Sequence, residues 1–139
     1  MVLPGVTAVI RDDAGRYLLA LHVSGKRWGF VGGAVEPLEA PRAALAREVR
    51  EELGVDIEIR SVIDSYGGAA LMNEYPNGDL VSYVTTAYLC RLVGDPTAAD
   101  VDEVSEVEWF GRDDIRTLAR FEWIDLVLDD VERLPRHDR

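Results

Sequence analysis

A segment in the middle of the chain combines a helical repeat of apolar residues with a cluster of carboxylates. Apolar residues recur at three- and four-residue spacing up to Leu53, and Gly54 is placed to end a helix in the left-handed conformation. We therefore expect a helix from about residue 39 to Leu53. Pro41 suits its first turn, where backbone amides have no partner within the helix. The face expected to pack against a sheet consists of Leu45, Ala46, Val49 and Leu53.

The segments on both sides of this helix have the composition of strands. The run Asp12-Asp13-Ala14-Gly15 predicts a turn between two apolar runs, and Asn77-Gly78 predicts another before a run rich in Val, Thr and Tyr. The expected strands cover residues 6–11, 17–23, 55–65 and 80–92, and helical spacing returns in two pieces within 113–134. Strands before and after a central helix, with helices at the end, predict an α/β (or α+β) fold with helices on a mixed sheet.

Length and composition predict one folded domain over residues 1–139. Hydrophobic residues make up 47% and charged residues 29%, which excludes the disordered and membrane-embedded classes. We find no secretory leader and no membrane-spanning run, so we expect a cytoplasmic protein without a membrane partner. The single cysteine, Cys90, excludes an intrachain disulfide, and its apolar neighbours predict a buried small side chain.

The formal net charge of −11 excludes a strong long-range attraction for nucleic acid or anionic lipid. A polyanionic substrate would need cations as intermediaries. We therefore expect no nucleic-acid partner.

Three glutamates form a carboxylate cluster on the expected helix. Glu48, Glu51 and Glu52 stand at i, i+3 and i+4 and so share an arc of roughly 100°. Like charges at this spacing cost about 0.2–0.5 kcal/mol per pair, and the helix C-terminus also disfavours anions. A divalent cation removes that cost, and Mg²⁺ commonly bridges carboxylates and phosphates. The alternative is a solvated acidic face that Arg47 and Arg50 partly neutralise.

The whole segment resembles the Nudix box. Residues 33–55 follow the pattern G-x5-E-x7-R-E-U-x-E-E-x-G-U, where U is a bulky aliphatic residue. The specified positions are Gly33, Glu39, Arg47, Glu48, Val49, Glu51, Glu52, Gly54 and Val55. Ordinary residue frequencies give such a match by chance at a rate on the order of 10⁻⁷. Family members often have proline before the paired glycines, whereas Val31 stands here.

The resemblance implies a Nudix-type α/β/α sandwich and a pyrophosphohydrolase. Such enzymes hydrolyse a nucleoside diphosphate linked to another group, such as a nucleoside triphosphate, ADP-ribose or a nucleotide sugar, with Mg²⁺ or Mn²⁺. By position, Glu48, Glu51, Glu52 and the carbonyl of Gly32 correspond to metal ligands. Arg47 with Glu39 corresponds to a pair that orients the carboxylates.

The substrate contacts and the general base are less constrained by the pattern. The segment 28–33 is expected to form a glycine-rich turn, called the glycine turn below. Candidate substrate contacts near this turn or in a later loop are Lys26, Arg27, Trp28 and Glu103. Candidate bases are Glu48 and Glu52 in the box and Glu103 and Glu106, expected in the loop before the last strand. Aromatic rings that are candidates to stack on a base, although packing roles are favoured, are Trp28, Tyr66, Tyr75 and Tyr83. His22 is expected to be a packed histidine.

Two other functions fit parts of the sequence. A non-catalytic regulatory Nudix domain would bind a nucleotide without cleaving it, but the box carboxylates are intact. RNA decapping is a second alternative, which the acidic charge disfavours. The sequence leaves the identity of the nucleotide, the number of metal ions and the formation of a homodimer open.

Overall fold

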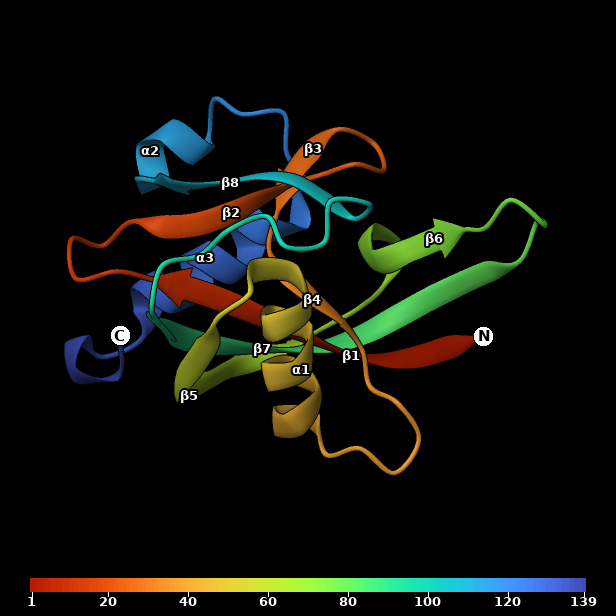
Figure 1. Ribbon diagram of the computed structural model, residues 1–139, viewed down its shortest axis with the longest axis horizontal. Coiled ribbons are helices and arrows are strands. Elements are labelled where there is room, and N and C mark those ends of the chain that lie inside the picture. The colour runs from red at the N-terminus through yellow and green to blue at the C-terminus, as the bar shows by residue number, and fades with distance from the viewer.

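The computed structural model describes residues 1–139 as one mixed sheet with helices on both faces (Figure 1). The strands are β1 (Val2–Arg11), β2 (Tyr17–His22), β3 (Arg27–Gly29), β4 (Val31–Ala34), β5 (Asp56–Tyr66), β6 (Met72–Glu74), β7 (Leu80–Val93) and β8 (Val104–Phe110). The helices are α1 (Pro41–Leu53), α2 (Arg112–Ile115) and α3 (Trp123–Arg133), with short 3₁₀ turns η1 (Ala69–Leu71) and η2 (Arg136–Asp138). The expected α/β sandwich is confirmed.

Strand β1 is the centre of the sheet and places Gly32 and Gly33, the glycine turn of the sequence, which lie within strand β4. It runs parallel to β7 along most of its length and takes two different partners on the other side. Its last residues pair antiparallel with β2, whereas its middle residues pair antiparallel with β4, so that Gly33 lies opposite Val6 and Gly32 opposite Thr7. The two glycines are therefore held by backbone pairing to the most central strand.

Two hydrophobic cores follow from the alternation of side chains along β1. Val6 and Ile10 point to one face, where they pack in a cluster with Leu45 of α1. Val9 points to the other face, into a second cluster with Val127 of α3. A strand buried on both faces has a continuous apolar sequence, as β1 does. Helix α1 lies in front of the sheet and α3 behind it in Figure 1.

Helix α1 begins at Pro41 and ends as predicted. Gly54 has φ 71°, and its N–H donates to the carbonyl of Arg50 at 3.0 Å. The prediction that Ala46 belongs to the packed face is wrong: Ala46 is exposed, and Ala44 is buried instead. The reason is that the buried arc of the helix includes Glu52, so the helix is rotated with its carboxylate face toward the sheet.

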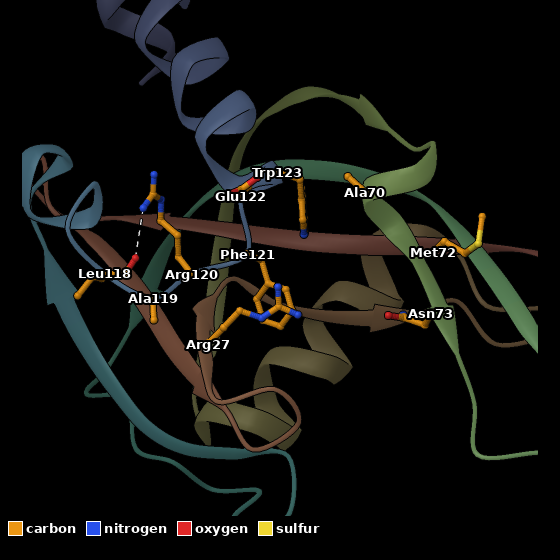
Figure 2. A pocket seen from close by; sticks show the side chains of 10 residues that line it. All are labelled: Arg27, Ala70, Met72, Asn73, Leu118, Ala119, Arg120, Phe121, Glu122 and Trp123. Carbon is orange, nitrogen blue, oxygen red and sulfur yellow. Dashed lines mark hydrogen bonds between the residues drawn. The ribbon is translucent and has the colours of Figure 1, made fainter. Parts of the chain in front are cut away.

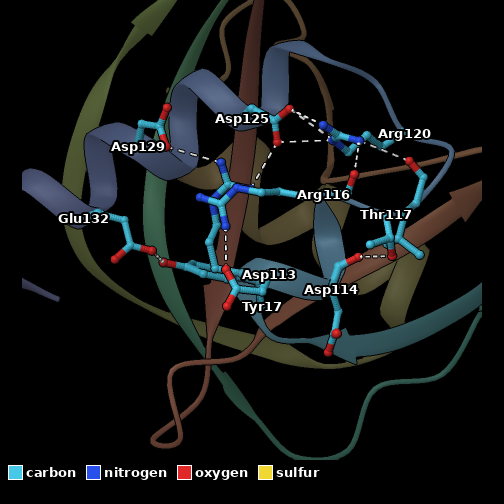
Figure 3. Close-up of polar contacts among 11 residues, drawn as sticks. Tyr17, Asp113, Asp114, Arg116, Thr117, Arg120, Asp125, Asp129 and Glu132 are labelled. Carbon is cyan, nitrogen blue, oxygen red and sulfur yellow. Dashed lines mark hydrogen bonds and ion pairs between the residues drawn. The ribbon is translucent and has the colours of Figure 1, made fainter.

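The last third of the chain closes the second face of the sheet. Helix α3 is tied to the preceding connection by Asp125, which accepts from Arg120 at 2.7 Å (Figure 3). Asp125 also accepts from Arg112 of α2 at 3.2 Å. Tyr66 at the end of β5 donates to Asp130 of α3 at 2.6 Å. Cys90 is buried, as predicted. None of the helices combines the length and apolar character needed to cross a lipid bilayer.

Candidate active site

The glycine turn brings the backbone of β4 against its neighbours at van der Waals distance. A Cβ atom on Gly32 would lie 2.1 Å from the carbonyl oxygen of Val6. A Cβ atom on Gly33 would lie 2.4 Å from the carboxyl group of Glu48. Glycine is required at residue 32, where a side chain would collide with the backbone of the central strand, and at residue 33 a side chain would displace the carboxyl group of Glu48.

Glu52 is the most buried of the three clustered carboxylates, with 6% of its surface exposed. Its Oε2 accepts from the N–H of Gly32 at 3.0 Å, and no lysine or arginine forms an ion pair with it. Burial raises the pKa of Glu52 to about 8; the Gly32 hydrogen bond opposes this rise, and the nearby charges of Glu48, Glu103 and Asp100 add to it. A buried carboxylate without a cationic partner is costly and points to a cation that binds there.

Glu48 and Glu51 are connected by Arg47. Its Nη1 donates to Glu48 Oε1 at 3.0 Å and lies 3.4 Å from Glu51 Oε2. The Nε and Nη2 atoms donate to the two oxygens of Glu39 at 2.8 and 2.9 Å, a bidentate pair. Nη2 also donates to the carbonyl of Ala34 at 3.1 Å. The arginine thus fixes the helix and the glycine turn in one arrangement.

This charge network alters the pKa of two further glutamates. The hydrogen bonds from Arg47 lower the pKa of Glu39 to about 2. Partial burial raises the pKa of Glu48, and Arg47 only partly offsets this rise. Glu48 and Glu52 are therefore two neighbouring acids whose surroundings disfavour the charged form.

The donor set fits a hard divalent cation. Carboxylate oxygens with a backbone carbonyl nearby are the ligands that Mg²⁺ and Mn²⁺ prefer. As the side chains stand, no group of three His, Cys, Asp or Glu residues is gathered around one point. Glu51 is about half exposed and rests on Arg47, so its side chain has room to turn toward Glu48 and Glu52.

A cleft of about 740 Å³ opens directly beside Gly32 and Gly33. Its floor contains the buried hydroxyl groups of Thr7 and Thr85, which lie 2.8 Å apart. Among its lining residues a single side chain, Arg27, carries a permanent positive charge. The cleft has the size of a site for a small molecule.

The structure brings some of the predicted substrate contacts to this cleft. Glu103 and Arg27 line it, whereas the lining does not include Lys26 or Trp28. Trp28 packs edge-on against Phe110, with ring centroids 4.9 Å apart. Lys26 is exposed in the turn before β3.

The other aromatic and acidic candidates divide in the same way. Tyr75 and Tyr83 line the cleft, with their hydroxyl groups 3.1 Å apart, whereas Tyr66 packs against α3. The placement of Glu106 in the loop before the last strand is wrong: it lies within β8, opposite Leu21, because the strand begins two residues earlier at Val104.

His22 belongs to both the packing and the cleft. Its Nε2 atom lies 2.8 Å from the carbonyl oxygen of Phe30, and its ring contacts Phe121 edge-on. It therefore is a packed histidine, as expected, whose side chain also forms part of the cleft wall. Sequence reasoning missed Asn73 and Phe121, which lie in segments without a recognisable pattern.

Known proteins resemble this chain over most of its length. The NUDIX domain family model matches residues 1–129. This chain belongs to the Nudix family. An RNA pyrophosphohydrolase of Saccharophagus degradans is 32% identical over 113 residues, which cover 76% of this chain and 66% of that protein. The nucleoside triphosphatase NudI of an Enterobacter species is 29% identical over 124 residues, which cover 81% of this chain and 85% of that protein.

Solved structures of Nudix hydrolases have the same fold. The MutT Nudix hydrolase from Burkholderia pseudomallei is 29% identical, with a TM-score of 0.69 over 81% of this chain and 85% of the other. A Nudix hydrolase from Nitrosomonas europaea is 24% identical, with a TM-score of 0.77 over 95% of this chain and 89% of the other. The likeness therefore extends from the box to the whole sandwich.

Proposed function

We propose that this Nudix protein hydrolyses a pyrophosphate bond in a nucleoside diphosphate linked to another group, such as a nucleoside triphosphate, ADP-ribose or a nucleotide sugar. In this proposal Glu48, Glu51, Glu52 and the carbonyl of Gly32 hold Mg²⁺ or Mn²⁺. The observation that carries it is the buried Glu52, which has no cationic partner and lies against the glycine turn beside the cleft.

The residues of the chain supply position and charge for this reaction. Arg47 holds Glu48 in a fixed orientation through Glu39, and Gly33 leaves the space that the Glu48 carboxylate occupies. A divalent cation, when bound, offsets charge on the phosphate oxygens and lowers the pKa of water. The phosphoanhydride needs no covalent activation by the protein, so the required catalysis consists of positioning the diphosphate and an attacking water and of offsetting charge on the phosphate oxygens.

Glu103 is our candidate for the residue that accepts a proton from the attacking water. It lines the cleft and lies close enough to influence the pKa of Glu52. Its backbone is fixed, because its N–H donates to the Asp100 carbonyl at 3.1 Å and its own carbonyl accepts from Val23 at 2.9 Å. Glu106 lies on β8 outside the cleft and serves as a matched control.

The test combines turnover with metal binding. The wild type should release a nucleoside monophosphate from members of a nucleotide panel in the presence of Mg²⁺ or Mn²⁺. Glu52→Gln should lower kcat by about 100-fold or more, and Glu106→Gln should not change it. In thermal melts, Mn²⁺ should raise the Tm of the wild type and of Glu106→Gln but have little effect on Glu52→Gln.

Glu52→Gln also removes a carboxyl group that has no cationic partner and whose charged form is disfavoured by burial. Without metal, its Tm should therefore be higher than that of the wild type, which shows that the variant is folded. Undiminished turnover by Glu52→Gln, or a Tm that responds to Mn²⁺ as in the wild type, would contradict the proposed role of this residue.

A further inference from the structure

His22 connects the wall of the cleft to the backbone just before the paired glycines. Its Nε2 atom lies 2.8 Å from the carbonyl oxygen of Phe30. A carbonyl oxygen accepts hydrogen bonds and cannot donate them, so Nε2 carries a hydrogen in this contact and His22 is the donor. Gly32 follows Phe30 by two residues. The bond therefore acts on the short segment that leads to Gly32.

The Phe30 carbonyl depends on this side chain for its hydrogen bond. Phe30 is a buried residue that lies between β3 and β4, outside both strands. No backbone N–H donates to its carbonyl, although backbone pairing satisfies the strands on either side. A buried carbonyl without a partner costs free energy, because it has left water and gained nothing in exchange. Without the His22 hydrogen, we expect the chain at Phe30 to shift.

The His22 ring is held in place by its neighbours. Phe121 contacts it edge-on, with ring centroids 5.6 Å apart at 85°. Phe121 is in turn covered by Arg27, whose guanidinium carbon lies 4.2 Å from the ring centroid, beside a second cavity of about 550 Å³ (Figure 2). A Cβ atom on Gly29 would lie 2.9 Å from Phe121 and 3.3 Å from the His22 ring, so glycine leaves the space that both rings occupy. The His22 ring therefore has little freedom to turn away from the Phe30 carbonyl.

The backbone that carries His22 is fixed as well. His22 ends β2, where it pairs with Arg27 of β3 and with the first residue of β8. The next residue, Val23, donates its N–H to the carbonyl of Glu103 at 2.9 Å. The base of the His22 side chain thus belongs to the same sheet as Glu103, and its tip reaches the segment before Gly32. The side chain holds these two parts of the cleft at a fixed spacing.

Gly32 is the point at which a shift of this segment reaches the carboxylate cluster. Its N–H donates to Glu52 Oε2 at 3.0 Å, and no other group in the protein donates to this carboxyl group. A small displacement of Gly32 would therefore lengthen the bond that orients Glu52. Groups that orient metal ligands affect metal affinity although they do not touch the metal.

We propose that His22 is a positioning residue, whose hydrogen bond to the Phe30 carbonyl holds Gly32 at the distance that orients Glu52. This rests on the proposed function, in which Glu52 and the Gly32 carbonyl hold a divalent cation. His22 touches neither the cation nor the reacting phosphate in this proposal. It acts through the backbone of residues 30–32, and the essential group is the N–H at the tip of its side chain.

Two substitutions of nearly equal size separate the hydrogen bond from the packing of the ring. His22→Gln keeps an N–H at the tip of the side chain, whereas His22→Met has none, and both lose the ring. The control is Val131→Ala, which removes buried methyl groups near the end of α3, whereas the first residue of this helix, Trp123, lines the cleft.

Three measurements report on the segment, the metal site and the reaction. They are the rate of hydrogen exchange of the Gly32 N–H without metal, the Kd for Mn²⁺ from the paramagnetic resonance signal of the free ion, and kcat and KM for the best nucleotide. Exchange is read against the slowest amides of the chain, which report global unfolding.

In His22→Met the Gly32 N–H should exchange about tenfold faster than in the wild type, beyond any change in the slowest amides. The Kd for Mn²⁺ should rise about tenfold, the lower end of the usual effect of losing a group that orients a metal ligand. The kcat should fall with little change in KM. His22→Gln should stay near the wild type in all three measurements, and Val131→Ala should lower the Tm alone.

The proposal is overturned if the Gly32 N–H exchanges alike in His22→Met and His22→Gln, because the hydrogen bond would then have no part in holding Gly32. An equal rise in the Kd for Mn²⁺ in Val131→Ala would overturn it as well, since lost stability alone would explain the effect. The exchange of Gly32 needs neither metal nor substrate. If His22→Met loosens Gly32 but the wild type hydrolyses no nucleotide, the proposed function fails and the positioning role stands.

Discussion

Glu39 shows how one residue outside the carboxylate cluster affects the stability of the site. The pKa of Glu39 is lowered to about 2 by its hydrogen bonds with Arg47, against 4.5 for the free side chain. A carboxyl group with a lowered pKa contributes stability above 4.5 that is lost as the pH falls toward 2. We predict that Glu39→Gln is less stable than the wild type at pH 7 and that the difference shrinks steadily between pH 4.5 and 2.

Urea denaturation at several pH values measures this difference. Glu106→Gln is the control, because Glu106 forms no ion pair and should give the same curve as the wild type. A stability difference between Glu39→Gln and the wild type that is equally large at pH 7 and pH 2.5 would show that the loss does not come from the charge of Glu39 paired with Arg47.

At the scale of single residues, the sequence indicates which side chains to assign to the site, but it does not indicate how buried each of them is. The spacing of Glu48, Glu51 and Glu52 places them on one arc but treats them alike. In the structure Glu52 is buried and Glu51 is about half exposed. The difference depends on the rotation of α1 against β4, which is set by contacts with Gly32 and cannot be inferred from helical spacing alone.

An ion-pair cluster joins α2, the α2–α3 connection and α3. Asp125 accepts from Arg120 (Figure 3) and from Arg112; burial favours its neutral form, but the two arginines lower its pKa overall. We predict that Asp125→Asn lowers the free energy of unfolding by about 1–3 kcal/mol at pH 7, because it leaves the partly buried guanidinium group of Arg120 without a carboxylate and Arg112 with Asp129 alone. Since the pKa is lowered, this loss should disappear as the pH falls below about 3.8.

Asp113→Asn is the matched control for this prediction. Asp113 pairs with Arg116 at 2.7 Å in the same region but is fully exposed. Exposed ion pairs contribute about 0–1 kcal/mol, so this variant should be nearly as stable as the wild type in urea. Equal losses in the two variants would mean that burial of the Asp125 cluster has no energetic importance.

At the scale of elements, long strands and helices were predictable and short ones were not. The hairpin of β1 and β2 and the long strand β7 follow from their apolar runs and turn residues. Strand β6 has three exposed residues and no alternation, and it forms because the turn at Asn77-Gly78 folds it back onto β7. Phe121 reaches the cleft only through the pairing of its loop with Trp28. Both of these parts of the cleft wall therefore depend on tertiary contacts.

The charge of the whole molecule limits the substrates that it can attract. The chain carries −11, and Arg27 is the single permanent cation in the lining of the cleft. Binding of RNA depends on several phosphate contacts along the strand, and a cleft lined by one cation does not supply them. One relative is named as an RNA pyrophosphohydrolase and another as a nucleoside triphosphatase. The turnover of RNA and of mononucleotides by this protein should therefore be compared directly. We predict that an RNA oligonucleotide with a 5′-triphosphate has a kcat/KM at least about tenfold below that of the best mononucleotide.

Salt dependence separates the reasons for that difference. Repulsion between an acidic protein and a polyanion decreases as salt screens it, so kcat/KM for the RNA should rise or stay constant between about 50 and 200 mM salt. An enzyme that binds RNA through basic contacts would lose affinity over the same range, because each phosphate contact releases counterions. Efficient RNA turnover that falls steeply with salt would show that a basic surface acts outside the cleft, and the mononucleotide would then be the secondary substrate.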